Sequence, residues 1–281
     1  MSLYVSMLIY TVVLATTGTL VVVVPSQDGL VVAADSRSTV LGQNFDGIGK
    51  LQIARTHRPI LVTITGTSDF ADPPPPGVSL KEWMPKATYQ YRGNPFVQTL
   101  LEKRPEISLS HTSAAEVASA LASSLNEFLG ARPALTVQYV SQDLCRLVLC
   151  QESTDGVMLF ASVPLVVDDR GHVEAQATTF KRYGGQDGKV MEFIGEDRYT
   201  TEHVLGSHGT HLLDQRAADI LNAKGFIRDF RSTDAAWLAQ AIIKAAEATT
   251  KIVPVPSGNG IGGPVAIYLV TAKHVSPISV P

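Results

Sequence analysis

Three residues near the amino terminus, Thr19, Asp35 and Lys50, have side chains suited to acyl transfer. A threonine hydroxyl is a weak nucleophile and needs a base to accept its proton. The free α-amine of an amino-terminal threonine can be that base, because an α-amine titrates near about pH 8. This chemistry requires Thr19 to become the first residue of the chain. It also requires a cation close by and an acid that positions the cation.

The elements expected around Thr19 and Asp35 bring these two residues together. Two apolar runs, 20–24 and 30–34, flank an Asp-Gly turn signal and predict a β-hairpin. Thr19 precedes the first strand and Asp35 follows the second. Hairpin pairing makes these positions neighbours. Asp35 also has a simpler interpretation, as a polar residue that ends a strand.

The rest of the chain predicts an α+β fold in which helices cover sheets, because strand runs and helix runs are segregated. Lys50 opens a run that pairs with the next apolar run, although it could equally be a solvated strand start. Further strands are expected at 50–54, 60–65, 135–140, 144–150, 157–167, 173–180, 189–194 and 265–271. Helices are expected at 112–130, at 200–224 with a break or kink at 206–209, and at 233–250. Residues 72–95 show neither the hydrophobic period of a helix nor that of a strand, and they predict an irregular surface insertion.

The charge, the cysteines and the histidines argue against nucleic-acid binding, a disulfide and a metal site. The net charge of −3 and the absence of a basic run argue against nucleic acid. Cys145 and Cys150 lie five residues apart in one apolar run, so they should face opposite sides of a strand and not form a disulfide. His208 and His211 fit a polar surface better than a metal site. We therefore expect no metal and no cofactor.

Residues 1–18 are a signal-like segment or a propeptide. No charged side chain occurs before Asp28, and 3–15 is a short apolar run. Signal cleavage after Ala15 would expose Thr16, and the missing basic residue argues against it. The run is too short for a membrane span, so no stable span is expected. An extra strand is the third interpretation, and the location stays open between export and a cytoplasmic protein with a propeptide.

The sequences TGTLVVVVPSQDGLVVAADSRST, GKLQIA and ITGTSD resemble the opening of a proteasome β-type subunit, of a divergent bacterial type. The resemblance implies the four-layer αββα sandwich of the N-terminal-nucleophile hydrolase superfamily. It implies self-cleavage of the Gly18–Thr19 bond. It also implies that Asp35 and Lys50 assist Thr19, and that backbone N–H groups near Thr65 and Gly66 hold the oxyanion.

The chain departs from that family at several supporting positions. Glu196 replaces a serine of the family's supporting run, while Gly258 and Ile261 replace an acid and a serine before the last strand. Ser36 and Arg37 are expected to order the pocket floor through hydrogen bonds. The 72–95 insertion falls where the family's first long helix helps build rings, so a homo-oligomer is possible but a ring is not assumed.

The function expected from these residues is a self-processing threonine-type hydrolase that cleaves peptide or other amide bonds. Thr16 and Thr17 compete with Thr19 as nucleophile, but only Thr19 follows a glycine. Two alternatives remain. The first is a non-catalytic, proteasome-like assembly subunit, and the second is a non-proteolytic amidase, since fold does not fix substrate.

Overall fold

The structure is a computed structural model, and it describes residues 14–16, 20–41, 43–206, 212–253 and 260–280. Six residues singled out from the sequence lie outside the described residues. They are Thr17, Gly18, Thr19, His208, His211 and Gly258.

The predicted hairpin forms the centre of the first sheet. Strands β2 (Leu20–Ser26) and β3 (Gly29–Asp35) pair antiparallel, with Val21 opposite Ala34. The turn requires Gly29, whose φ is +138° and whose added Cβ would lie 2.3 Å from the carbonyl oxygen of Val270. The described strands of this sheet have the order β14-β2-β3-β15-β16. The other strands are β14 (Glu192–Gly195), β15 (Val265–Val270) and β16 (Val275–Pro277).

The second sheet has the order β12-β11-β10-β7-β6 over the described residues, and β13 also pairs with β11. Its strands are β6 (Leu51–Ala54), β7 (Ile60–Gly66), β10 (Gln142–Glu152), β11 (Met158–Val167), β12 (Val173–Ala175) and β13 (Thr179–Tyr183). Both cysteines lie on β10 and neither is in a disulfide. Cys145 packs on the helix-covered face and Cys150 on the face toward the other sheet, as their odd spacing predicts.

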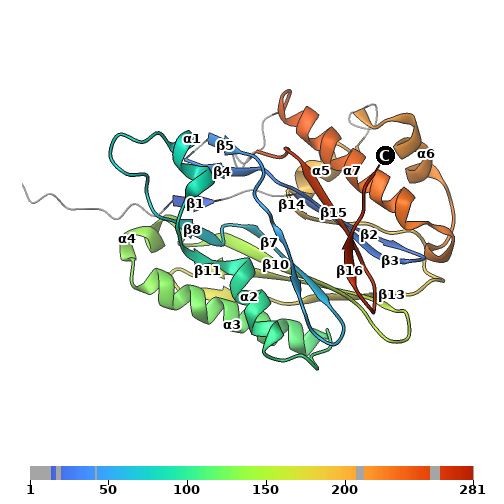
Figure 1. Cartoon of the computed structure of the whole chain (residues 1–281), viewed down its shortest axis with the longest axis horizontal. Helices are drawn as coiled ribbons and strands as arrows, with labels where there is room; N and C mark the ends of the chain where they lie inside the picture. The colour runs from blue at the N-terminus through green and yellow to red at the C-terminus, as the bar shows by residue number, and fades with distance from the viewer. Residues whose placement is uncertain (1–13, 17–19, 42, 207–211, 254–259, 281) are drawn as a thin grey trace, which may run out of the picture.

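Three apolar clusters hold the two sheets and the helices together, and Figure 1 shows α2 and α3 beside the second sheet and α7 beside the first. One lies between the second sheet and helices α2 (Gly93–Glu102) and α3 (His111–Gly130). Another joins the inner faces of the two sheets, where Val21, Leu61 and Phe160 are buried. The last lies between the first sheet and helices α5 (Asp197–His203), α6 (Gln215–Asn222) and α7 (Ser232–Thr250). Each sheet thus has one face against helices and one toward the other sheet.

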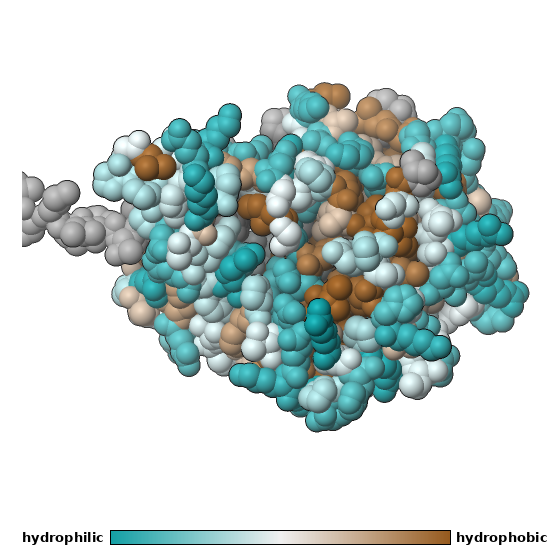
Figure 2. Space-filling view, in the orientation of Figure 1, coloured by the Kyte–Doolittle hydropathy of each residue, from teal (hydrophilic) through white to brown (hydrophobic). Residues whose placement is uncertain are grey.

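Figure 2 shows the face of the molecule that is seen in Figure 1, and the apolar surface on this face gathers around β15 and β16. These strands end the first sheet, and Val265, Leu269 and Val275 are only half-buried there. None of the helices in the described part of the chain has the length and apolar character needed to cross a bilayer.

The expectation of an irregular insertion at 72–95 is wrong. This region contains α1 (Leu80–Trp83), a 3-10 turn η1 (Met84–Lys86), strand β9 (Tyr89–Arg92) and the start of α2. Helix α2 buries Val97 and Leu101. These elements are too short to show a hydrophobic period, so the sequence pattern missed them.

The structure also bears on two other expected elements. Residues 135–140 form no strand; α4 (Pro133–Thr136) and the 3-10 turn η2 (Val137–Tyr139) lie there. Proline begins this helical turn, because its fixed φ suits the first helical position. The helix expected at 200–224, with a break or kink at 206–209, is two separate helices in the described residues, α5 and α6.

Short strands form two smaller sheets beside these layers. The segment before Thr19 contains β1 (Leu14–Thr16), which pairs with β8 (Asp69–Ala71), and β8 pairs with β9. Residues 1–13 lie outside the described residues, so the three interpretations of the segment 1–18 stay predictions. Strands β4 (Ser38–Val40) and β5 (Gln43–Phe45) form a hairpin that follows β3.

The inter-sheet cluster should carry much of the stability. Replacing Phe160, which is 1% exposed, by alanine removes a fully buried ring, so the free energy of unfolding should fall by about 3–5 kcal/mol. The matched change Phe226→Ala removes a ring that is 44% exposed and should cost less than about 1 kcal/mol. Urea unfolding measures both, and equal losses would contradict this packing.

Candidate active site

Asp35 is the buried centre of the candidate site. It ends β3 and is 1% exposed. One carboxylate oxygen, Oδ1, accepts hydrogen bonds from the Leu20 backbone N–H and from Lys50 Nζ, each at 3.0 Å. The other oxygen, Oδ2, accepts the Gly262 backbone N–H at 2.9 Å. Donors from three separate chain segments therefore meet on one carboxylate.

Local folding explains why these groups meet. The β2–β3 ladder pairs Val21 with Ala34, and its next step sets Leu20 beside Asp35. Lys50 directly precedes β6, and its side chain is 6% exposed. The predicted Asp35–Lys50 pair is thus present. Leu20 is the residue that follows Thr19 in the chain, so the pair lies beside the backbone next to the expected nucleophile.

Burial and charge oppose each other in this pair. Burial is the largest influence on both groups, and it raises the pKa of Asp35 and lowers the pKa of Lys50. The attraction between the two charges opposes both shifts. Three donors around the Asp35 carboxylate favour its ionised form. Lys50 Nζ also donates to the Arg37 carbonyl oxygen, so the ammonium is fixed in direction.

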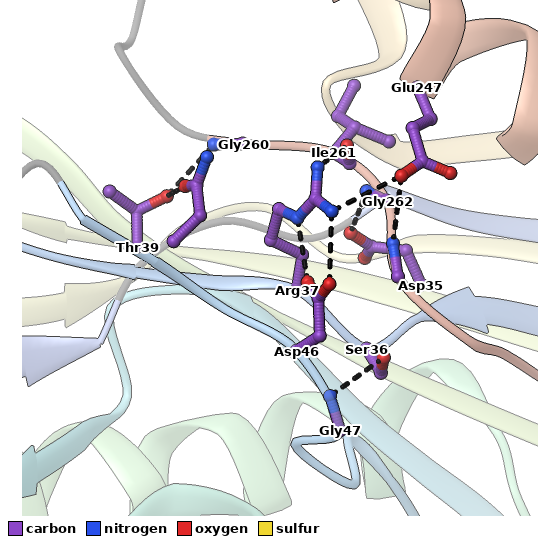
Figure 3. A network of polar contacts seen from close by, with 12 residues as sticks. Asp35, Ser36, Arg37, Thr39, Asp46, Gly47, Glu247, Gly260, Ile261 and Gly262 are labelled. Carbon is purple, nitrogen blue, oxygen red and sulfur yellow. Dashed lines mark hydrogen bonds and ion pairs between the residues drawn. The ribbon is translucent and has the colours of Figure 1, made fainter. Parts of the chain in front are cut away.

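Arg37 ties the surroundings of Asp35 together (Figure 3). Its guanidinium binds both carboxylate oxygens of Asp46, at 2.7 and 3.1 Å, and reaches Glu247 on α7 at 3.2 Å. It also donates to the Ile261 carbonyl oxygen at 3.1 Å. A bidentate arginine–carboxylate pair fixes geometry as well as charge. Asp46 and Glu247 were not predicted from the sequence.

The loop before β15 is held by this network. The backbone N–H of Arg37 donates to the Gly262 carbonyl oxygen at 3.1 Å, and the backbone N–H of Gly262 in turn donates to the Asp35 carboxylate. Gly262 has a φ of +141°, and an added Cβ would lie 2.4 Å from a Glu247 carboxylate oxygen. Only glycine fits there. Ser36 contributes on the other side, where its Oγ accepts the Gly47 N–H at 3.1 Å.

The predicted oxyanion residues lie at the end of β7. Thr65 is 2% exposed, and Gly66 has a φ of +83° with no room for a Cβ beside the Leu144 carbonyl. The following residue, Thr67, donates its N–H to that same carbonyl at 2.7 Å. Because Thr19 lies outside the described residues, the oxyanion assignment stays a prediction.

Glu196 and Ile261 have different places. Glu196 follows β14, whose last pair is Gly195 with Leu20, so it lies at the same end of the ladder as the site. Its carbonyl accepts the Thr200 N–H at 2.9 Å in the first turn of α5. Ile261 is fully buried in the apolar cluster under α7, and its side chain supplies no polar group.

Two cavities border the segment between β5 and Lys50. One, of about 230 Å³, is lined by Asp35, Ser36 and Lys50 together with 47–49 and 264–266. The other, of about 380 Å³, shares 47–49 and is also lined by residues of the region expected to be an irregular insertion: Met84, Pro85, Ala87, Tyr89 and Arg92. That region therefore lies next to the site.

Comparison with known proteins gives a fold likeness at low identity. No protein-family model matches the chain, and no curated protein sequence matches it. The chain is similar to a solved structure of Anbu (ancestral beta-subunit) from Yersinia bercovieri, with 14% identity, a TM-score of 0.46 and coverage of 92% of this chain and 87% of the other. The helical assembly of the Anbu complex from Pseudomonas aeruginosa is similar with 14% identity and a TM-score of 0.47, and the match covers 92% of this chain and 86% of the other. A Gly-1 mutant of Anbu from Hyphomicrobium sp. strain MC1 is similar with 15% identity and a TM-score of 0.46, and the match covers 92% of this chain and 85% of the other.

These comparisons correct the family assignment made from the sequence. The similar solved structures are Anbu proteins, a proteasome-like group distinct from the proteasome β-type subunits, so the assignment to the proteasome β-type family is wrong. A TM-score below 0.5 carries no argument about this chain's activity or assembly. Both must be argued from its own residues.

The Asp35–Lys50 pair should be strongly coupled. Removing one partner of a buried ion pair leaves an uncompensated charge, so Lys50→Met and Asp35→Asn should each lower the free energy of unfolding by about 3–5 kcal/mol. The double variant should lose less than the sum of the two. The exposed pair Arg104–Glu116 is the matched control and should change stability by less than about 1 kcal/mol. Additive losses at Asp35 and Lys50 in urea unfolding would contradict the coupling.

Asp46 should give the chain an acid-dependent stability. The hydrogen bond from Arg37 lowers the pKa of Asp46 below its ordinary value of 3.8. Its contribution is therefore complete above pH 3.8 and is lost as the pH falls through the folded-state pKa. Because the carboxylate is nearly half exposed, we expect less than about 1 kcal/mol. Unfolding measured against pH should show a shallower acid limb for Asp46→Asn, and parallel curves would rule this out.

Proposed function

We propose that this chain is a self-processing threonine-type hydrolase that cleaves amide bonds with Thr19 as its amino-terminal nucleophile. One observation carries the proposal: Asp35 Oδ1 accepts both the Leu20 N–H and the Lys50 ammonium. A single carboxylate oxygen thereby fixes the backbone next to Thr19 and a buried cation. This is the arrangement that a threonine acting through its own α-amine needs.

The layers of the fold support the same proposal. Helices, two facing sheets and further helices pack through three apolar clusters. We interpret them as a four-layer αββα sandwich of the N-terminal-nucleophile type, spanning residues 19–281. Residues 1–18 then form the segment that processing removes.

Processing is an acyl shift followed by hydrolysis. Thr19 Oγ attacks the Gly18 carbonyl carbon, and the bond from this carbon to the Thr19 nitrogen breaks as an ester forms. The hydroxyl proton ends on the released Thr19 amine. Water then hydrolyses the ester, which leaves a carboxylate on Gly18 and a free α-amine on Thr19.

Substrate turnover follows the same path with the α-amine as base. The amine accepts the Thr19 hydroxyl proton as Oγ attacks an amide carbonyl, and it passes the proton to the leaving amine. Water then hydrolyses the ester intermediate. The Lys50 ammonium favours a neutral α-amine and stabilises negative charge on Oγ. Backbone N–H groups at Thr65 and Gly66 would stabilise the oxyanion.

The energetics of the pair favour a catalytic chain over a purely structural one. A buried ion pair adds little net stability compared with apolar residues of similar volume, because both charges must leave water. Asp35 and Lys50 are nonetheless buried beside the start of β2. A catalytic role explains why the pair is buried despite the free energy needed to remove both charges from water. An assembly subunit has no need of such a pair. Which amides are cleaved, peptide or other, is decided by the walls of the cavity.

Amino-terminal sequencing and intact mass of the purified protein test the proposal. We expect the wild-type chain to begin at Thr19 and the Thr19→Ala chain to keep its preceding residues. Thr17→Ala is the matched control and should process normally. A wild-type chain that stays whole would refute the hydrolase and favour the non-catalytic alternative. A chain that begins at Thr16 would indicate cleavage after Ala15 instead.

Turnover of a panel of peptide and non-peptide amides tests the role of Lys50. In a chain already released at Thr19 by an added protease site, Lys50→Met should lower kcat by about 10²–10⁴-fold. Lys103→Met, an exposed lysine after α2, should leave kcat unchanged. Equal kcat for Lys50→Met and wild type would remove Lys50 from the mechanism.

A further inference from the structure

Strand β1 lies just ahead of the Gly18–Thr19 junction and is paired with the body of the protein. Its register with β8 is antiparallel, with Leu14 opposite Ala71, Ala15 opposite Phe70 and Thr16 opposite Asp69. Strand β8 pairs on its other side with β9. Figure 1 shows β1 beside β8, at the end of the molecule away from α6.

Strand β8 is a fixed platform for β1. The Asp69 carboxylate is buried and accepts the Gly93 N–H at 3.1 Å and Arg92 Nε at 3.4 Å. These bonds tie β8 to the first residue of α2 and to β9. The Phe70 ring is fully buried and lies 4.9 Å from the Phe128 ring of α3. The edge that β8 offers to β1 is therefore set by the core.

The chain is held on both sides of the junction. Residues 14–16 are paired with β8, and the Leu20 N–H is bound to Asp35. Four residue steps separate Thr16 from Leu20, and they can span at most roughly 14 Å when fully extended. Contacts therefore hold the chain on each side of this short link. Holding both sides of a reacting bond speeds an intramolecular reaction, because orientation is set in advance.

We propose that β8 and β9 form a clamp for the segment ahead of Thr19, and that pairing of β1 with this clamp positions the Gly18–Thr19 bond for cleavage. The inference rests on the proposed self-processing. The clamp comes from the region 69–92, which otherwise only borders the cavity. A three-residue strand hydrogen-bonded to one neighbouring strand is weakly held by itself. Once the covalent link to Thr19 is cut, the segment should leave and bare the edge of β8.

Proline substitutions in β1 test the clamp without changing the site. Ladder hydrogen bonds alternate along an antiparallel pair, so either Ala15→Pro or Thr16→Pro removes a donor from the ladder. Ala15→Ser keeps the backbone N–H and is the matched control. Residues 14–16 are absent after cleavage, so the released protein is the same molecule from every variant. Its turnover therefore shows whether folding was affected.

Two measurements are made on each variant. Hydrogen exchange at 69–71 is followed in an uncleavable Thr19→Ala background, and processing is followed by intact mass in the chain with Thr19. We expect at least one proline variant to exchange faster and to process at least about tenfold more slowly. Ala15→Ser should match the wild type, and turnover after complete processing should be equal for all.

The outcomes separate the clamp from the proposed function. Unchanged exchange at β8 in both proline variants would overturn the clamp. Faster exchange with an unchanged processing rate would overturn the positioning role. A wild-type chain that never processes defeats the proposed function and the positioning role with it, while the exchange data still decide whether β8 holds residues 14–16.

Discussion

The burial of the Asp35 carboxylate is the constraint on which the rest of the site depends. An ionised carboxylate out of water is costly unless its oxygens are hydrogen-bonded and a cation lies close. This one receives a backbone N–H from β2, a second from the loop before β15, and the Lys50 ammonium. Three segments far apart in the sequence must therefore be placed correctly for the carboxylate to be tolerated. The β2–β3 hairpin provides the first of these contacts by its register alone.

The contacts of Arg37 make that placement rigid. Arg37, the second residue after Asp35, joins Asp46, Glu247 and the loop at Ile261. The same loop carries Gly262, so the arginine that orders the surface also orients a donor to the buried carboxylate. Dipoles and charges fixed before a reaction begins need no reorganisation during it. The fixed positions of Asp35 and Lys50 would suit a nucleophile that is activated by the charges placed around it.

The sequence predicted the hairpin and helices α3 and α7 because each depends on a short-range pattern: an apolar run, a turn dipeptide or an apolar stripe. The hairpin register also accounts for the position of Asp35, whereas Lys50 was expected beside it from the resemblance of the surrounding motifs. The sequence did not predict Asp46 or Glu247, since Arg37 and Glu247 are 210 residues apart and no local pattern links them. It also missed α2 and β9, because β9 has only four residues and α2 begins with Gly-Asn-Pro. It gave 135–140 as a strand although Val137 is 72% exposed. The motif resemblance gave the wrong family, because a few short runs around a hairpin do not distinguish proteasome β-type subunits from similar groups.

Covalent labelling of the nucleophile tests the central claim most directly. A peptide β-lactone opens when a hydroxyl attacks its carbonyl, and the acyl group then stays on that oxygen. After incubation with the purified protein, tandem mass spectrometry of the digest locates the modified residue. The account predicts one acyl group per chain, on Thr19 as the first residue, and none in Lys50→Met. Unmodified Thr19, or an acyl group on any other residue, would contradict it.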